Sequence, residues 1–128
     1  MQVEKTSNYV RGYIFEREIR KRVEKVGLIV IRAAGSKPID LVAIRPDVAQ
    51  TYVAIIECKT DHYNYDAAKM KDYVVSLRSK YSLDSYFVLR DAGGIAWAVA
   101  ITDTARFRAV QGLFEKALGV RYIVVGMN

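Results

Sequence analysis

Two carboxylates and one lysine lie in two consecutive segments whose sequences are typical of β-strands. Glu57 and Lys59 flank Cys58 at the end of an apolar run, and Asp40 belongs to the segment before. Residues i and i+2 of a strand point to the same face, roughly 6.6 Å apart along the chain. Glu57 and Lys59 therefore project together, and Asp40 faces Glu57 if the two segments pair as a hairpin.

These residue types suit metal-assisted cleavage of a phosphodiester. Mg²⁺ takes oxygen ligands, usually one or two carboxylates with phosphate oxygens and waters. Asp40 and Glu57 would hold the ion, and the backbone carbonyl of Cys58 would add a ligand. The metal would acidify a water, and Lys59 would orient that water or stabilise the developing charge. The alternative is structural: a Glu57–Lys59 ion pair at the solvent edge and an aspartate that satisfies a turn.

A third carboxylate comes from the helix that is expected before these strands. At 100° per residue, Glu16 falls about 20° from Val23, which belongs to the apolar stripe of that helix. Glu18 falls on the far flank near Arg22, where a solvated ion pair is expected. We therefore expect Glu16, and not Glu18, to face the site. The alternative for Glu16 is a charged side chain at the edge of the core.

The elements that must position these residues follow from hydrophobic spacing and turn signals. Gly27 stands where a helix commonly ends, and Thr102 or Asp103 is placed to cap the last helix. The predicted order is αβββαββα, with a final short strand as an extension, which makes one mixed central sheet flanked by helices. The expected helices span 8–26, 65–81 and 103–118, and the expected strands span 28–33, 39–44, 52–59, 85–89, 95–101 and 121–125. In the second helix the apolar stripe consists of Met70, Tyr73, Val74, Leu77 and Tyr81.

Composition predicts a single domain over residues 1–128 with a basic surface. The net charge is +6 and the isoelectric point about 9.5. Nucleic acid is the commonest partner for such a charge, and solubility is the alternative use. The single cysteine excludes an internal disulfide and a cysteine-based zinc site. No apolar run reaches the ~20 residues of a membrane span, so we expect a cytoplasmic protein.

Several basic side chains are candidates for DNA contacts. The segment Gly35-Ser36-Lys37 precedes Asp40 and could approach a phosphate, although an ordinary polar turn is the alternative. Lys71 and Arg78 lie two turns apart on one flank of the second helix and could follow a DNA backbone. A solvated helix face explains the same pattern.

The chain resembles the archaeal Holliday-junction resolvases, including their archaeal-virus relatives, within the PD-(D/E)xK superfamily. The resemblance covers most of residues 8–101. The matching segments are Arg11-Gly12, Phe15-Glu16-Arg17-Glu18, residues 31–43 and Ile55-Ile56-Glu57-Cys58-Lys59.

The resemblance implies a restriction-endonuclease-like fold and a homodimer that binds four-way DNA junctions. Each subunit would make one cut with Mg²⁺, and Mn²⁺ would substitute. Glu16, Asp40 and Glu57 match acidic metal-site positions, and Lys59 matches the catalytic lysine. Met70 falls where some members have glutamine, and the segment after Lys59 is less basic than in many members. The expected DNA-binding residues are Arg11, Arg17, Arg32, Ser36, Lys37, Lys71 and Arg78.

The preferred function is an endonuclease that resolves branched DNA. Two alternatives stay open: a nuclease of the same fold that acts on flapped, nicked or duplex DNA, and a non-catalytic DNA-binding protein. Dependence on metal separates the last from the others. Four aromatic residues could serve either the core or a dimer interface, namely Phe87, Trp97, Phe107 and Phe114.

Overall fold

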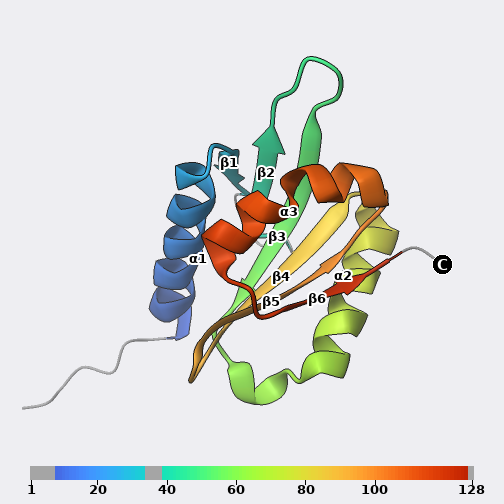
Figure 1. Ribbon diagram of the computed structural model, residues 1–128. Coiled ribbons are helices and arrows are strands. Elements are labelled where there is room, and N and C mark those ends of the chain that lie inside the picture. Colours follow the sequence, from blue (N-terminus) through green and yellow to red (C-terminus); the bar gives the residue numbers. More distant parts are fainter. Residues whose placement is uncertain (1–7, 34–38, 127–128) are drawn as a thin grey trace, which may run out of the picture.

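The computed structural model describes residues 8–33 and 39–126 (Figure 1). The predicted order αβββαββα with a final strand is confirmed. A short 3₁₀ turn, η1, precedes the second helix. The elements are α1 (Asn8–Lys25), β1 (Ile29–Arg32), β2 (Leu41–Arg45), β3 (Tyr52–Lys59), η1 (His62–Asn64), α2 (Ala67–Tyr81), β4 (Asp84–Asp91), β5 (Gly94–Ala100), α3 (Thr104–Leu118) and β6 (Tyr122–Val125).

The six strands form one mixed sheet in the order β1-β2-β3-β4-β5-β6. Neighbours are antiparallel except for two pairs, β3 with β4 and β5 with β6. Parallel neighbours need a long crossover connection. The two crossovers are made by α2 and α3, which explains why the helices fall where they do in the sequence.

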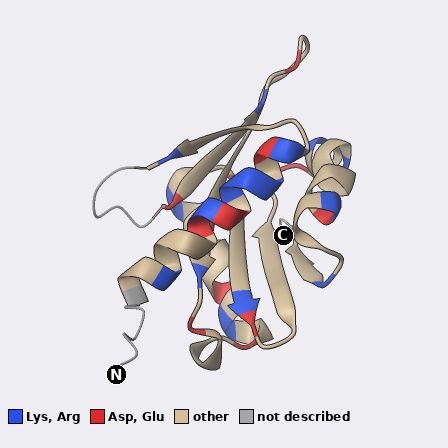
Figure 2. Cartoon of the chain, turned by 90° about the vertical axis from the view of Figure 1, so that its left-hand side faces the viewer, with Lys and Arg blue, Asp and Glu red and all other residues tan. Residues whose placement is uncertain are grey.

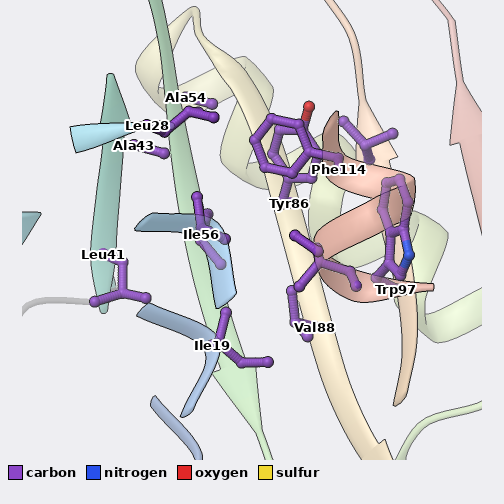
Figure 3. Packing of buried hydrophobic residues seen from close by; sticks show 14 of the residues in the cluster. Ile19, Leu28, Leu41, Ala43, Ala54, Ile56, Tyr86, Val88, Trp97 and Phe114 are labelled. Atoms are coloured by element: carbon purple, nitrogen blue, oxygen red, sulfur yellow. The ribbon is translucent and has the colours of Figure 1, made fainter. Parts of the chain in front are cut away.

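The helices form two layers around the sheet: α1 and α3 lie on one face and α2 on the other (Figure 1). The larger core is between α1, α3 and the sheet, where Ile19, Ile56, Tyr86 and Phe114 pack together (Figure 3). Four aromatic residues were expected to serve either the core or a dimer interface, namely Phe87, Trp97, Phe107 and Phe114. Each is at most 2% exposed, so all four belong to the core of a single chain.

The helix ends follow local sequence chemistry. Gly27 after α1 and Gly119 after α3 both have φ of 103°, a conformation that favours glycine. Asp103 caps α3 by accepting a hydrogen bond from the N–H of Arg106 at 2.9 Å. The predicted start of the second helix at residue 65 was two residues early, because Asp66 is its N-cap and accepts from a backbone N–H at 2.8 Å.

A buried polar network joins β3, β4 and the segment before α3. Asp84 is 3% exposed and accepts hydrogen bonds from the Tyr52 hydroxyl at 2.6 Å and from the N–H and hydroxyl of Thr102 at 2.8 and 2.9 Å. The Tyr52 and Tyr86 hydroxyls lie 2.9 Å apart. Burial, and then the neighbouring Tyr86 and Asp84, raises the pKa of Tyr52, which keeps its hydroxyl protonated as a donor.

The C-terminal strand is held by one aromatic stack and by one arginine. The rings of Trp97 and Tyr122 are stacked at 4.0 Å, and the indole N–H donates to the carbonyl of Gly119 at 2.9 Å. From α2, the Arg78 guanidinium donates to the carbonyls of Ile101 at 2.9 Å and of Gly126 at 3.0 Å. These contacts fix β6 against β5.

One face of β1 and β2 carries apolar side chains that α2 does not cover. α2 packs on β4, β5 and β6, whereas Ile29 and Ile31 alternate with the buried Val30 and are each 52% exposed. Their strand partners, Ile44 and Val42, are half-buried beside them. Within the described part of the chain, no helix is long and apolar enough to cross a membrane.

Candidate functional site

The antiparallel pairing of β2 and β3 brings Asp40 and Glu57 together. Leu41 pairs with Ile56, so one step further along the two strands Asp40 stands opposite Glu57. The carboxylate Oδ2 of Asp40 accepts a hydrogen bond from the backbone N–H of Cys58 at 2.7 Å. Asp40 is half-buried and Glu57 is 4% exposed. The hairpin arrangement expected from the sequence is therefore present.

The buried carboxylate of Glu57 and the half-buried carboxylate of Asp40 lie close together, so the pair favours a bound proton or cation. Burial, and then the neighbouring Asp40, raises the pKa of Glu57 to about 9. A hydrogen bond from Tyr73 and the charge of Lys59 act in the opposite direction. Like charges stripped of water are stable only when a proton or a cation neutralises them. An oxygen-ligated divalent cation fits this pair, because carboxylates are the ligands that Mg²⁺ prefers.

Lys59 lies on the same face of β3 as Glu57, at the end of the strand. It is half-buried, pairs with Leu89 of β4, and lowers the pKa of Glu57 through its charge. A cleft of about 630 Å³ opens beside it. The cleft is lined by Arg11, Gly12, Cys58, Lys59, Thr60, Asp61, His62 and Tyr63.

Tyr73 is a site residue that the sequence analysis did not identify as one. Its hydroxyl donates to Oε2 of Glu57 at 2.9 Å, and its ring lies 4.9 Å from that of Phe87. The sequence placed Tyr73 only in the apolar stripe of the second helix. One signal was available, because a buried tyrosine hydroxyl usually finds a partner and Glu57 was an expected acceptor on the facing strand.

Glu16 and Glu18 differ as the helical wheel predicted. Glu16 is 9% exposed, whereas Glu18 pairs with Arg22 at 3.0 Å on the helix surface and also with Arg90. Glu16 accepts a hydrogen bond from Nε of Arg32 at 2.7 Å, and this interaction raises the pKa of Arg32. The guanidinium of Arg32 thus neutralises Glu16 at the end of β1.

The carboxylates do not form a three-member metal cluster. Among the residues that the structure describes, no group of three or more His, Cys, Asp or Glu side chains is placed to hold a metal ion. Asp40 and Glu57 are the pair brought together, and Glu16 is turned to Arg32. The role of Glu16 as a metal ligand therefore stays a prediction, as does that of the Cys58 carbonyl.

The basic residues expected to contact DNA occupy different environments. Arg11 and Arg17 are exposed on α1, where basic and acidic residues alternate (Figure 2). Lys71 is exposed on α2. Arg78 is half-buried and donates to backbone carbonyls, which gives it a structural task. Two further candidates, Ser36 and Lys37, lie outside the described residues.

The element order and the mixed sheet place a carboxylate–lysine set where β2 begins and β3 ends. A family model described as "Archaeal holliday junction resolvase (hjc)" matches residues 7–79, and the chain belongs to that family. The family match contains all four of Glu16, Asp40, Glu57 and Lys59.

Two known proteins illustrate the similarity. A protein of Methanocaldococcus jannaschii named "Crossover junction endodeoxyribonuclease Hjc" is 44% identical over 66 residues, which are 52% of this chain and 42% of that protein. The chain thus matches less than half of the length of this curated relative. A solved structure of Archaeoglobus fulgidus Hjc, a Holliday junction resolvase, has 18% identity and a TM-score of 0.48, with 80% of this chain and 95% of that chain covered.

Proposed function

We propose that this protein is a metal-dependent endonuclease that resolves four-way DNA junctions by paired phosphodiester cleavage. The observation that carries the proposal is the pair of half-buried Asp40 and buried Glu57 beside Lys59, in a chain that belongs to the junction-resolvase family. A non-catalytic DNA-binding protein has no need of a buried carboxylate beside a second one, because such a pair costs stability unless it is neutralised.

In this proposal the carboxylates hold a divalent cation, and Lys59 stabilises negative charge on the phosphate. Asp40 and Glu57 would hold Mg²⁺, with Mn²⁺ as a substitute, and the Cys58 carbonyl would add a ligand. Glu16, which is bonded to Arg32, would have to leave that arginine to join the ligand set. When bound, the cation acidifies a water and neutralises charge on the phosphate. The N–H of Cys58 fixes Asp40. Lys59 is placed to stabilise negative charge that develops on the phosphate.

The DNA-binding role rests on the basic surface around this site. Arg11, Arg17 and Arg32 lie on α1 and the neighbouring end of β1, and Lys71 lies on α2. With the net charge of +6 they support binding to phosphates through Coulomb attraction and counterion release. Ser36 and Lys37 complete the proposed set, whereas the guanidinium of Arg78 is engaged by backbone carbonyls.

Paired cleavage calls for two copies of the site, and a homodimer supplies them. The four aromatic residues that could have formed the interface are used in the core of one chain, namely Phe87, Trp97, Phe107 and Phe114. The apolar face of Ile29, Ile31, Val42 and Ile44 supports the proposal, because a partner subunit would remove it from water.

The test uses a labelled four-way junction, a linear duplex of matched sequence and a flap, each with Mg²⁺ and with chelator. We expect symmetric cuts confined to the junction in Mg²⁺ and none in chelator. Asp40→Asn and Glu57→Gln should lower the cleavage rate by a factor of at least about 10². Exposed Asp47 supplies a matched control, because Asp47→Asn should cut normally.

The other outcomes choose between the alternatives. Equal cutting of flap or duplex would keep the nuclease and remove the junction specificity. Tight binding to the junction without cleavage in Mg²⁺ or Mn²⁺ would make the protein a non-catalytic DNA binder.

A further inference from the structure

The cleft beside Lys59 has a second wall that the proposed cleavage chemistry does not use. This wall is η1, the turn that directly follows β3 and the candidate metal ligands. Its residues His62 and Tyr63 line the cleft, and Arg11 of α1 also lines it. Whatever fills the cleft therefore lies next to the site where a phosphate would be cut.

Tyr63 presents an almost fully exposed ring from this wall. The side chain is 91% exposed, and the ring of His62 lies 4.0 Å from it with an interplanar angle of 34°. The two rings thus form a pre-assembled aromatic surface. The exposed ring of Tyr63 is therefore open to a planar ligand.

The turn that carries the rings is held by hydrogen bonds. The N–H of Asn64 donates to the carbonyl of Asp61 at 3.0 Å, and the Asn64 side chain donates to the Asp61 carboxylate at 3.1 Å. The N–H of Tyr65 donates to the carbonyl of His62 at 3.2 Å. Because the turn is fixed before any ligand arrives, binding to the rings costs little ordering of the backbone.

The cleft is lined by both charged side chains and aromatic rings. Lys59 and Arg11 supply positive charge, which suits a phosphate. The carboxylate of Asp61 is an acceptor beside the rings, which suits the amino or imino hydrogens of a nucleobase. A nucleotide carries these two kinds of group together.

We propose that the His62–Tyr63 surface stacks a base that leaves its helix at the branch point of the DNA, next to the scissile phosphate. This proposal rests on the proposed function, since it assumes a DNA substrate at the same site. In continuous duplex every base is already stacked and paired, whereas a branch point offers a base that is cheaper to unstack. The stacking surface would therefore favour branched DNA without reading its sequence.

The test is a double-mutant cycle that combines substitution of Tyr63 with removal of the base it is proposed to stack. Binding to a four-way junction is measured in chelator, where no cleavage is needed, for the wild type, Tyr63→Leu and Tyr63→Phe. Each protein is also titrated with junctions that carry one abasic nucleotide, placed in turn at each position near the branch point. Val48→Ala, on the exposed β2–β3 turn, is the control for loss of an exposed apolar side chain.

We expect Tyr63→Leu to weaken binding to the intact junction about tenfold to one-hundredfold. At one abasic position the same substitution should have no further effect, because the stacking partner is gone. Tyr63→Phe keeps the ring and should bind within about twofold of the wild type, as should Val48→Ala.

Equal losses on intact and abasic junctions at every position would overturn the stacking proposal, as would a Tyr63→Phe defect as large as that of Tyr63→Leu. Cleavage by the wild-type protein, measured separately with Mg²⁺, decides the proposed function. A wild type that cuts junctions while Tyr63→Leu binds normally would leave the function standing and remove only the stacking role.

Discussion

Burial and neighbouring side chains set the pKa of the Glu57 carboxyl. Burial and the carboxylate of Asp40 raise it, and the hydrogen bond from Tyr73 and the charge of Lys59 lower it. Without metal, its pKa of about 9 means that the carboxyl holds a proton at neutral pH. A cation ligated by Glu57 must displace that proton. If Glu57 is a metal ligand as proposed, metal binding and proton release are coupled at this residue.

The coupling predicts the pH dependence of metal affinity. Below about pH 9 the metal-free protein binds the proton, so Mg²⁺ affinity should rise as the pH is raised from 7 and level off above about 9. Titration calorimetry in buffers of different ionisation enthalpy would measure the proton released. Constant affinity from pH 7 to 9, with no proton release, would contradict the expectation. Glu57→Gln provides the control, since it has no such proton to lose.

Loss of the Tyr73 hydroxyl should alter the metal requirement rather than the affinity for DNA, because this hydroxyl is bonded to the proposed metal ligand Glu57. A hydrogen bond to a charged group is worth about 1.5–3 kcal/mol, so Tyr73→Phe should raise the Mg²⁺ concentration for half-maximal cleavage about tenfold. The KM for DNA should change little. Tyr65→Phe in the same aromatic cluster is the matched control. An unchanged Mg²⁺ requirement in Tyr73→Phe would mean that the hydroxyl does not position Glu57.

At the scale of elements, the Asp84 network holds the start of β4 to the ends of β3 and β5. Asp84→Ala leaves the hydroxyl of Tyr52 and the N–H of Thr102 without their acceptor. Buried groups left unsatisfied cost about 1–3 kcal/mol, so the free energy of unfolding should fall by about 2–4 kcal/mol. Urea unfolding would measure this fall. Asp72→Asn on the exposed face of α2 should stay within about 0.5 kcal/mol of the wild type.

Local chemistry explains which elements could be predicted from the sequence. The glycine after α1 and the aspartate before α3 act within one turn of the chain, so Gly27 and Asp103 could be placed from their neighbours. The contrast between Glu16 and Glu18 follows from helix geometry alone. The pairing of Asp40 with Glu57 was also predictable, since a turn joins two consecutive strands.

Contacts between distant elements could not be placed in this way. The hydrogen bond from Tyr73 to Glu57 depends on how α2 docks on the sheet, and so do the carbonyls that Arg78 reaches. The pairing of Arg32 with Glu16 depends on how α1 crosses the end of β1. The start of α2 was misplaced because η1 and Tyr65 continue the connection by a few residues, although Tyr65 packs with the helix.

At the scale of the whole molecule, the apolar face of Ile29, Ile31, Val42 and Ile44 is the proposed dimer interface. Ile31 is 52% exposed on that face, and Ile31→Lys would place a charge in the proposed interface. We expect the variant to sediment as a monomer where the wild type is a dimer. Val48→Lys, on the exposed turn, is the control and should remain a dimer.

The same variant has a functional readout. A supercoiled plasmid with a cruciform is linearised when both strands are cut in one encounter and is only nicked when a single subunit acts. Ile31→Lys should shift the product from linear to nicked DNA. Continued dimerisation of Ile31→Lys in sedimentation would place the interface on another surface.

The sole tryptophan of the sequence makes the attachment of the last strand observable. Trp97 is buried in β5, its ring is stacked on Tyr122 of β6, and its N–H is bonded to the Gly119 carbonyl. Release of β6 would remove Tyr122 from the indole ring, whereas Tyr86 and Phe114 would stay packed against it. Native tryptophan fluorescence therefore responds both to core formation and to the docking of the C-terminal strand, and a Tyr122→Ala variant separates the two in a stopped-flow refolding experiment without any added label.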